Sequence, residues 1–81
     1  MKGGFKLLTR EKLENKLSKP NKVCIITVCK LPGGAVETLV NYQNLQTKVD
    51  YLLSAYDEEL KLKTMSEIKL LDCIVISEAE I

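Results

Sequence analysis

Residues 22–40, KVCIITVCKLPGGAVETLV, decide the fold of this chain. The segment Lys22–Lys30 is rich in β-branched residues and is bounded by turn residues, a pattern that predicts a strand. In the turn that follows, Pro32 fixes φ, and Gly33 or Gly34 accepts a positive φ. We therefore expect Ala35–Val40 to return beside the first strand as the second arm of a β-hairpin.

A helix is predicted ahead of this hairpin. It begins at Thr9, whose side chain can cap free backbone amides, and Leu8 and Leu13 occupy the two positions of a hydrophobic staple. Leu13 and Leu17 then form a narrow apolar stripe. The segment 18–21, SKPN, ends the helix because the residue before a proline avoids the helical conformation.

A second helix and a third strand are predicted after the hairpin. Asn41 or Asn44 caps this helix, which runs to about residue 56 or 57. Its apolar residues recur at the spacing of an amphipathic helix: Leu45, Val49, Leu52, Leu53 and Tyr56. Residues 58–65 fit either an extension of the helix or an edge strand. The third strand is Ile68–Ile76, and residues 77–81 form a polar tail.

The predicted order of elements is helix, strand, strand, helix, strand. A chain of 81 residues fits one domain, here residues 1–81, with residues 1–7 as a flexible arm around two glycines. The fold class is therefore α+β, a small αββαβ domain. Its sheet is mainly antiparallel and three-stranded, with room for a fourth short edge strand, and it packs with two helices.

Both long strands of this prediction are apolar on both faces. In the first strand, Val23, Ile25, Thr27 and Cys29 alternate with Cys24, Ile26 and Val28. In the third strand, Leu70, Ile74 and Ile76 alternate with Leu71, Cys73 and Val75. A strand with one wet face normally alternates apolar and polar residues. Either the helices flank opposite faces, or the second face packs against another copy of the chain. We favour self-association, with a dimer as the simplest form.

The composition argues against catalysis, metal binding and membrane insertion. The chain has no histidine, which removes the commonest general base and zinc ligand. Cys24 and Cys29 project from opposite faces of one strand and cannot share a metal ion. Gly33 and Gly34 lack the spacing of a phosphate-binding loop. We therefore expect no enzyme activity, no metal and no cofactor. With 28% charged residues and no apolar run near the ~20 residues of a membrane span, we expect no membrane segment.

Two charged residues and three tyrosines are candidates for a binding surface. Lys30 and Asp72 interrupt apolar strands, and a buried charge without a partner is costly, so each must reach solvent, a partner or an interface. Tyrosine is favoured at interfaces, which adds Tyr42, Tyr51 and Tyr56. The chain has three cysteines, and an odd number favours the reducing cytoplasm over a disulfide-bonded setting.

Charge is divided unevenly along the chain and supports an alternative function. Residues 1–30 carry eight Lys or Arg and two Glu, a net +6, whereas residues 31–81 carry four Lys and nine Asp or Glu, a net −5. A nucleic-acid or nucleotide-binding protein would use the basic half, through Lys6, Arg10, Lys12, Lys16, Lys19 and Lys22. The only aromatic residue near these cations is Phe5, so a platform for base stacking is weak.

A longer stretch of the sequence resembles a known family. The residues are LPGGAVE at 31–37, then Asn41 and Lys48, and YLLSAYDEELKLK at 51–63. They are similar to short proteins of uncharacterised function that tailed phages and prophages of Gram-positive bacteria encode. The resemblance implies an accessory gene product made in the bacterial host cytoplasm. Such a protein would bind a host protein or a defence component, or sequester a nucleotide signal. It assigns no functional residues.

Overall fold

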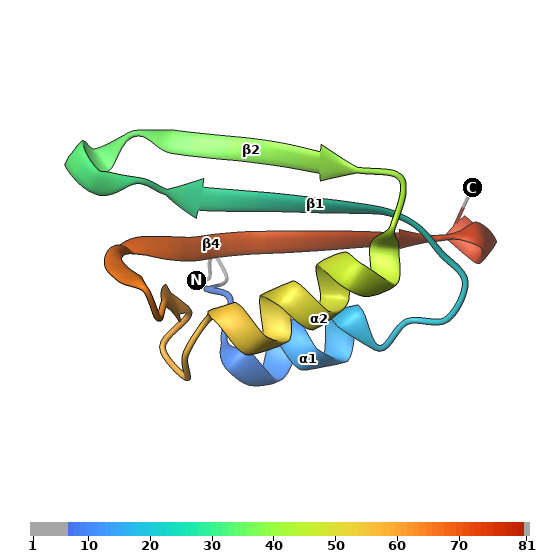
Figure 1. Ribbon diagram of the computed structural model, residues 1–81. Coiled ribbons are helices and arrows are strands. Elements are labelled where there is room, and N and C mark those ends of the chain that lie inside the picture. The colour runs from blue at the N-terminus through green and yellow to red at the C-terminus, as the bar shows by residue number, and fades with distance from the viewer. Residues whose placement is uncertain (1–6, 81) are drawn as a thin grey trace, which may run out of the picture.

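The computed structural model describes residues 7–80, which form two helices and a four-stranded antiparallel sheet (Figure 1). The elements, in chain order, are α1 (Arg10–Leu17), β1 (Lys22–Lys30), β2 (Val36–Asn41), α2 (Leu45–Ala55), β3 (Lys61–Leu62) and β4 (Met65–Ser77). The strand order in the sheet is β2-β1-β4-β3. The predicted α+β class is confirmed, and β3 is the fourth, short strand.

The first helix begins as its sequence predicts. Thr9 is the N-cap of α1, and its hydroxyl accepts a hydrogen bond from the Lys12 amide at 3.2 Å. The second helix begins differently. Asn44 precedes α2 in a left-handed conformation, φ 53°, and its side chain makes no capping hydrogen bond, while Asn41 belongs to β2. Asn44 therefore occupies the predicted N-cap position, but the predicted capping hydrogen bond is wrong; asparagine suits the left-handed backbone there.

The hairpin between β1 and β2 follows the prediction to within one residue. β1 spans Lys22–Lys30 as expected, and β2 spans Val36–Asn41 rather than residues 35–40. Gly33 and Gly34 adopt φ values of 89° and 96°, which side chains disfavour, so the turn requires glycine at both positions.

Residues 56–64 form a turn and a short strand instead of extending α2, which ends at Ala55. The Asp57 carboxylate accepts hydrogen bonds from the amides of Glu59 and Lys61 at 2.8 and 2.9 Å and closes this turn. β4 is longer than the predicted strand at both ends. Ser77, the first residue of the predicted polar tail, is the last residue of β4 and is 8% exposed.

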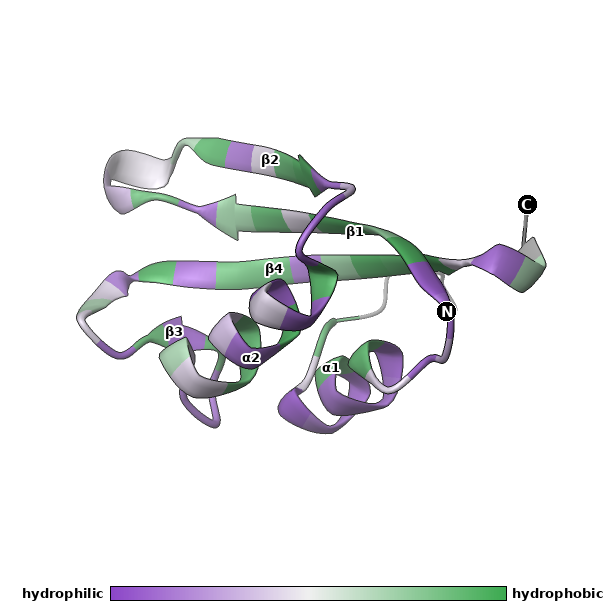
Figure 2. Ribbon diagram, turned by 45° about the vertical axis from the view of Figure 1, so that its right-hand side comes forward, coloured by the Kyte–Doolittle hydropathy of each residue, from purple (hydrophilic) through white to green (hydrophobic). Residues whose placement is uncertain are grey.

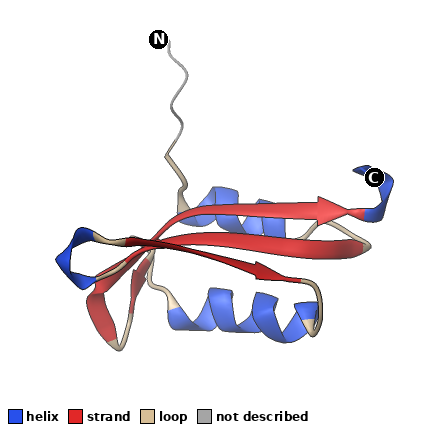
Figure 3. Ribbon diagram, turned by 90° about the horizontal axis from the view of Figure 1, so that it is seen from above, coloured by secondary structure: helices blue, strands red, loops and turns tan. Residues whose placement is uncertain are grey.

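Both helices lie on the same side of the sheet (Figures 1 and 2). α1 packs on β4. α2 packs on β1 and lies nearer than α1 to the edge formed by β2 (Figure 3). The alternative in which the helices flank opposite faces is therefore wrong. The core between the helices and the sheet contains Leu13, Leu17, Ile25, Cys29, Val49, Leu52, Tyr56, Leu60, Leu70, Cys73 and Val75.

A β-bulge in β4 changes which residues face the helices. Val28 of β1 pairs with Asp72, whereas its neighbour Cys29 pairs with Leu70, so Leu71 is the extra residue. The bulge places Leu70 on the helix side together with Cys73, contrary to the strict alternation predicted for this strand. Within residues 7–80, no helix has the length and apolar character needed to cross a membrane.

Candidate binding surface

The face of the sheet turned away from the helices is largely apolar, and no segment within residues 7–80 forms a layer over it. We call it the open face. Its residues alternate with the core residues and pair across β2, β1 and β4: Ile26, Val28, Lys30, Val36, Thr38, Val40, Asp72, Ile74 and Ile76. Val36, Val40 and Ile74 are 60%, 47% and 43% exposed. Figure 2 shows hydrophobic segments in all three of these strands.

The free edge of β2 continues the open face. Leu31 donates its amide to the carbonyl of Ala35 across the hairpin at 2.7 Å, so odd-numbered residues of the two strands turn their peptide groups toward each other. Peptide groups alternate along a strand, which means that Val36, Thr38 and Val40 direct their N–H and C=O groups outward. The same three residues place their side chains on the open face.

The opposite edge of the sheet is protected. β3 pairs with the first part of β4, and the bulge at Leu71 interrupts the remainder. The Asp72 carboxylate accepts a hydrogen bond from the Cys73 amide at 2.8 Å, and Lys19 donates to the Val75 carbonyl at 3.2 Å. Short partner strands, bulges and charged side chains are the devices that keep edge strands from pairing. β2, with the sequence VETLVN, has neither a lysine nor a proline nor a bulge.

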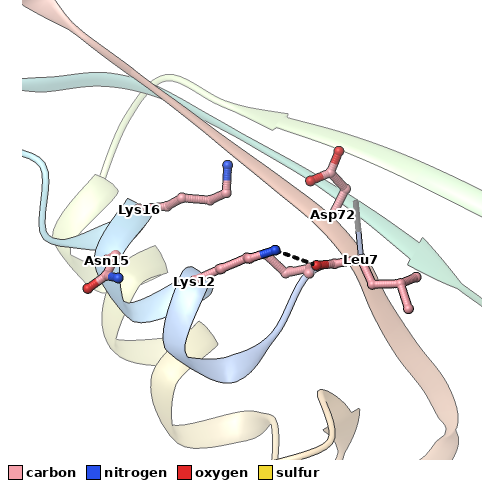
Figure 4. A pocket seen from close by; sticks show the side chains of 6 residues that line it. Leu7, Lys12, Asn15, Lys16 and Asp72 are labelled. Carbon is pink, nitrogen blue, oxygen red and sulfur yellow. Dashed lines mark hydrogen bonds between the residues drawn. The ribbon is translucent and has the colours of Figure 1, made fainter. Parts of the chain in front are cut away.

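A groove of about 610 Å³ runs between α1 and this protected edge. Lys12 and Lys16 of α1 lie on one side and Asp72 of β4 on the other (Figure 4). Lys12 donates to the Leu7 carbonyl at 3.3 Å. Charged groups of both signs line this groove.

The predicted binding residues do not form a single site. Tyr51 and Tyr56 meet on the helix side, with their rings edge to face at 6.3 Å, and Lys48 lies 5.5 Å from the Tyr51 ring centroid. Tyr56 is 4% exposed, and burial raises the pKa of its hydroxyl far above the ordinary value. Tyr42 is exposed between β2 and α2.

Lys30 lies at the end of the open face, and Asp72 lies where that face meets the protected edge. Lys30 is exposed at the end of β1, where it pairs with Val36 on one side and Lys69 on the other. Asp72 is exposed at the protected edge, where its carboxylate holds the Cys73 amide. Both charges reach solvent, as the cost of an unpaired buried charge requires.

A pocket of about 290 Å³ opens between β2 and α2. Its lining includes the buried residues Thr27, Cys29 and Tyr56. Lys48, which is half-buried, and Glu37, which is exposed, also line it. The Cys29 sulfur lies 3.4 Å from the Tyr56 hydroxyl. The Thr27 hydroxyl is fully buried and has no hydrogen-bond partner.

The basic residues of the alternative nucleic-acid surface are dispersed by the fold. The Arg10 guanidinium donates to the carbonyls of Leu53 and Tyr56 at 2.7 and 2.8 Å, so it serves to join α1 to α2. Lys19 is engaged with β4, and Lys6 lies outside the described residues. Lys12 and Lys16 remain together on α1 beside the acidic Asp72. Lys22 lies at the start of β1, opposite Ser77.

The cysteines are buried in the sheet. Cys24, Cys29 and Cys73 are free thiols, and burial raises the pKa of Cys73 to about 11. Among residues 7–80, no three Cys, Asp or Glu side chains lie close enough together to hold a metal ion.

Comparison of the chain with known family models, with curated proteins and with solved structures finds no match.

The exposed apolar residues of β2 and β4 are not among the five residues that the sequence indicated for binding. Val36, Val40 and Ile74 are visible in the sequence only as members of alternating strands, and alternation does not say which set the helices cover. The sequence predicts β2 as one arm of a hairpin but does not predict that this arm lies at the edge of the sheet. Which arm borders a third strand depends on long-range pairing.

Proposed function

We propose that this protein is a non-enzymatic binding protein that works as a homo-oligomer, with a dimer as the simplest assembly. Two copies associate at β2, where exposed side chains of the open face and a free hydrogen-bonding edge coincide. The observation that carries this proposal is that both helices cover one face of the sheet, while Val36, Val40 and Ile74 stay exposed on the other.

Two properties of the open face support a second copy as its occupant. Contiguous exposed apolar patches on soluble proteins commonly mark interaction sites. Here the two residues with the highest exposures of that patch, Val36 and Val40, belong to the strand whose hydrogen-bonding edge is also free. A neighbour that covers the side chains and also pairs with the backbone satisfies both features.

Light scattering over a range of protein concentrations tests this proposal. We expect the wild type to dimerise, and we expect Val40→Lys to dissociate it because a charge then enters the apolar contact. Tyr42→Lys is the matched control, since Tyr42 is 72% exposed but lies outside β2. A wild-type monomer at high micromolar concentration would overturn the proposal.

The similarity to phage and prophage proteins supports a protein of the bacterial host, including a defence component, as the further target of the oligomer. Capture from bacterial lysate with the wild type and with Val40→Lys, read by mass spectrometry, identifies that target. We expect specific capture that depends on oligomerisation. Equal capture by the wild type and by Val40→Lys would show that target binding does not depend on self-association.

Nucleic acid is the competing ligand, and its test is electrophoretic. Because Arg10 and Lys19 are engaged within the fold, we expect no mobility shift of DNA or RNA at low salt. A shift that weakens steeply as salt rises would instead favour the nucleic-acid function.

A further inference from the structure

We propose that β2 of one copy pairs with β2 of a second copy, antiparallel, about a two-fold axis at Thr38. This inference rests on the self-association proposed above and specifies how the copies meet. The two four-stranded sheets would then join into one continuous sheet with an unbroken open face.

The backbone groups needed for this pairing are already aligned. Val36, Thr38 and Val40 direct their N–H and C=O groups outward, because the intervening residues pair with β1. Antiparallel pairing about Thr38 sets Thr38 opposite Thr38 of the second copy and Val36 opposite Val40 of the second copy. Each of these pairs exchanges two hydrogen bonds, which gives about six across the interface.

The sequence of β2 favours this register over its neighbours. A two-fold axis at Glu37 would place two carboxylates directly opposite each other, and like charges in that position are destabilising. An axis at Leu39 would pair Val36 with Tyr42 of the second copy, which lies beyond the end of β2. Only the axis at Thr38 uses all three outward residues within the strand and sets Glu37 opposite Leu39.

The side chains in this register are compatible. On the open face, Val36 meets Val40 of the second copy on each side of a central threonine pair. Cross-strand pairs of β-branched residues and of two threonines are favourable. The pairing brings Val36 and Val40, the residues of the open face that are 60% and 47% exposed, into lateral contact across the interface. A two-fold interface requires that one strand be complementary to itself, and the segment Val36–Val40 meets this requirement.

The protected edge of β4 explains why the pairing involves β2. A chain with two free edges could extend into a filament, whereas a chain with one free edge closes as a dimer. β3, the bulge at Leu71, and the contacts made by Asp72 and Lys19 obstruct the β4 edge.

A charge exchange at Thr38 tests this register. In Thr38→Lys and in Thr38→Glu, each homodimer would place like charges at the two-fold axis, so we expect the dimer dissociation constant to rise at least about tenfold. A mixture of the two variants places lysine opposite glutamate, and we expect it to dimerise like the wild type. Circular dichroism of each variant verifies the fold, since Thr38 is exposed.

The outcomes separate this inference from the proposal beneath it. A monomeric wild type would remove both. A dimeric wild type whose Thr38→Lys and Thr38→Glu variants dimerise equally well alone would overturn only the register. Loss of dimerisation in each variant without recovery in the mixture would also overturn the register.

Amide hydrogen exchange gives a measurement that needs no substitution. We expect the amides of Val36, Thr38 and Val40 to exchange more slowly as protein concentration rises. The Leu39 amide, which is directed toward β1, is the internal control. Copies that met only face to face would leave the three outward amides unaffected by concentration, and that result would overturn the edge pairing.

Discussion

At the scale of single residues, Thr27 stands out because it is a polar side chain in an apolar layer. It lies on β1 facing the helices, is 1% exposed, and its hydroxyl has no partner. A buried hydroxyl without a hydrogen bond loses its water and gains nothing in return. The buried hydroxyl of Thr27 therefore lowers the stability of the folded protein relative to an apolar side chain of the same shape.

Replacing this hydroxyl should stabilise the protein. Thr27→Val keeps the shape of the side chain and removes the orphaned group, so we expect the free energy of unfolding in urea to rise by about 1 kcal/mol. Thr27→Ala removes a methyl group as well and should lose this advantage through the cavity that it leaves. A Thr27→Val variant no more stable than wild type would show that the hydroxyl is satisfied in solution.

The buried thiol of Cys73 makes the folded protein less stable as pH rises into the alkaline range. Burial raises the pKa of its thiol from 9.0 to about 11, so the folded protein keeps this proton while the unfolded chain loses it. The contribution is fully present below pH 9 and is lost as pH rises through 11, by about 3 kcal/mol in total.

The expected loss is checked by urea denaturation at pH 8 and at pH 10.5. Cys73→Ala should show a smaller fall in the free energy of unfolding than the wild type. Cys24→Ala is the control, because Cys73 is still present and the wild-type fall should persist. An identical fall in both variants would assign the effect to other groups.

At the scale of elements, one arginine joins the two helices. Arg10 at the start of α1 donates to the carbonyls of Leu53 and Tyr56 at the end of α2, where carbonyls lack helical partners. The positive charge also suits the negative end of that helix dipole. Arg10, which the sequence suggested as a nucleic-acid contact, therefore connects the two helices.

Removal of this connection should be costly. We expect Arg10→Ala to lower the free energy of unfolding by about 2 kcal/mol, because two charge-assisted hydrogen bonds are lost. Arg10→Lys should recover less than half, since an ammonium group lacks the planar fork that reaches both carbonyls. Lys12→Ala, a change on the exposed side of α1, is the control and should stay within about 0.5 kcal/mol of wild type in the same assay.

At the scale of the whole molecule, association links stability to concentration. If folded copies bind each other through β2, the midpoint of thermal unfolding rises with protein concentration, because binding favours the folded state. We expect this rise for the wild type and its absence for Thr38→Lys. Calorimetry over a hundredfold range of concentration measures it. A concentration-independent midpoint for the wild type would argue against self-association.

Local sequence signals determined the elements themselves. The run of β-branched residues at 22–30, the proline and glycines of the turn, the Thr9 cap and the spacing of apolar residues in α2 each act over a few neighbours. Signals of that range can be read without knowing the remainder of the chain. They also showed correctly that the first strand is apolar on both sides.

Tertiary structure alone decided how those elements are combined. Two helices on one side of the sheet, the bulge at Leu71 and the edge position of β2 depend on contacts between segments distant in sequence. The bulge reversed the predicted side of Leu70, because one inserted residue changes the parity of every residue beyond it. The sequence by itself determined that a second apolar face exists. Long-range pairing decided that neither helix covers this face and that β2 borders it, because neither property follows from neighbouring residues.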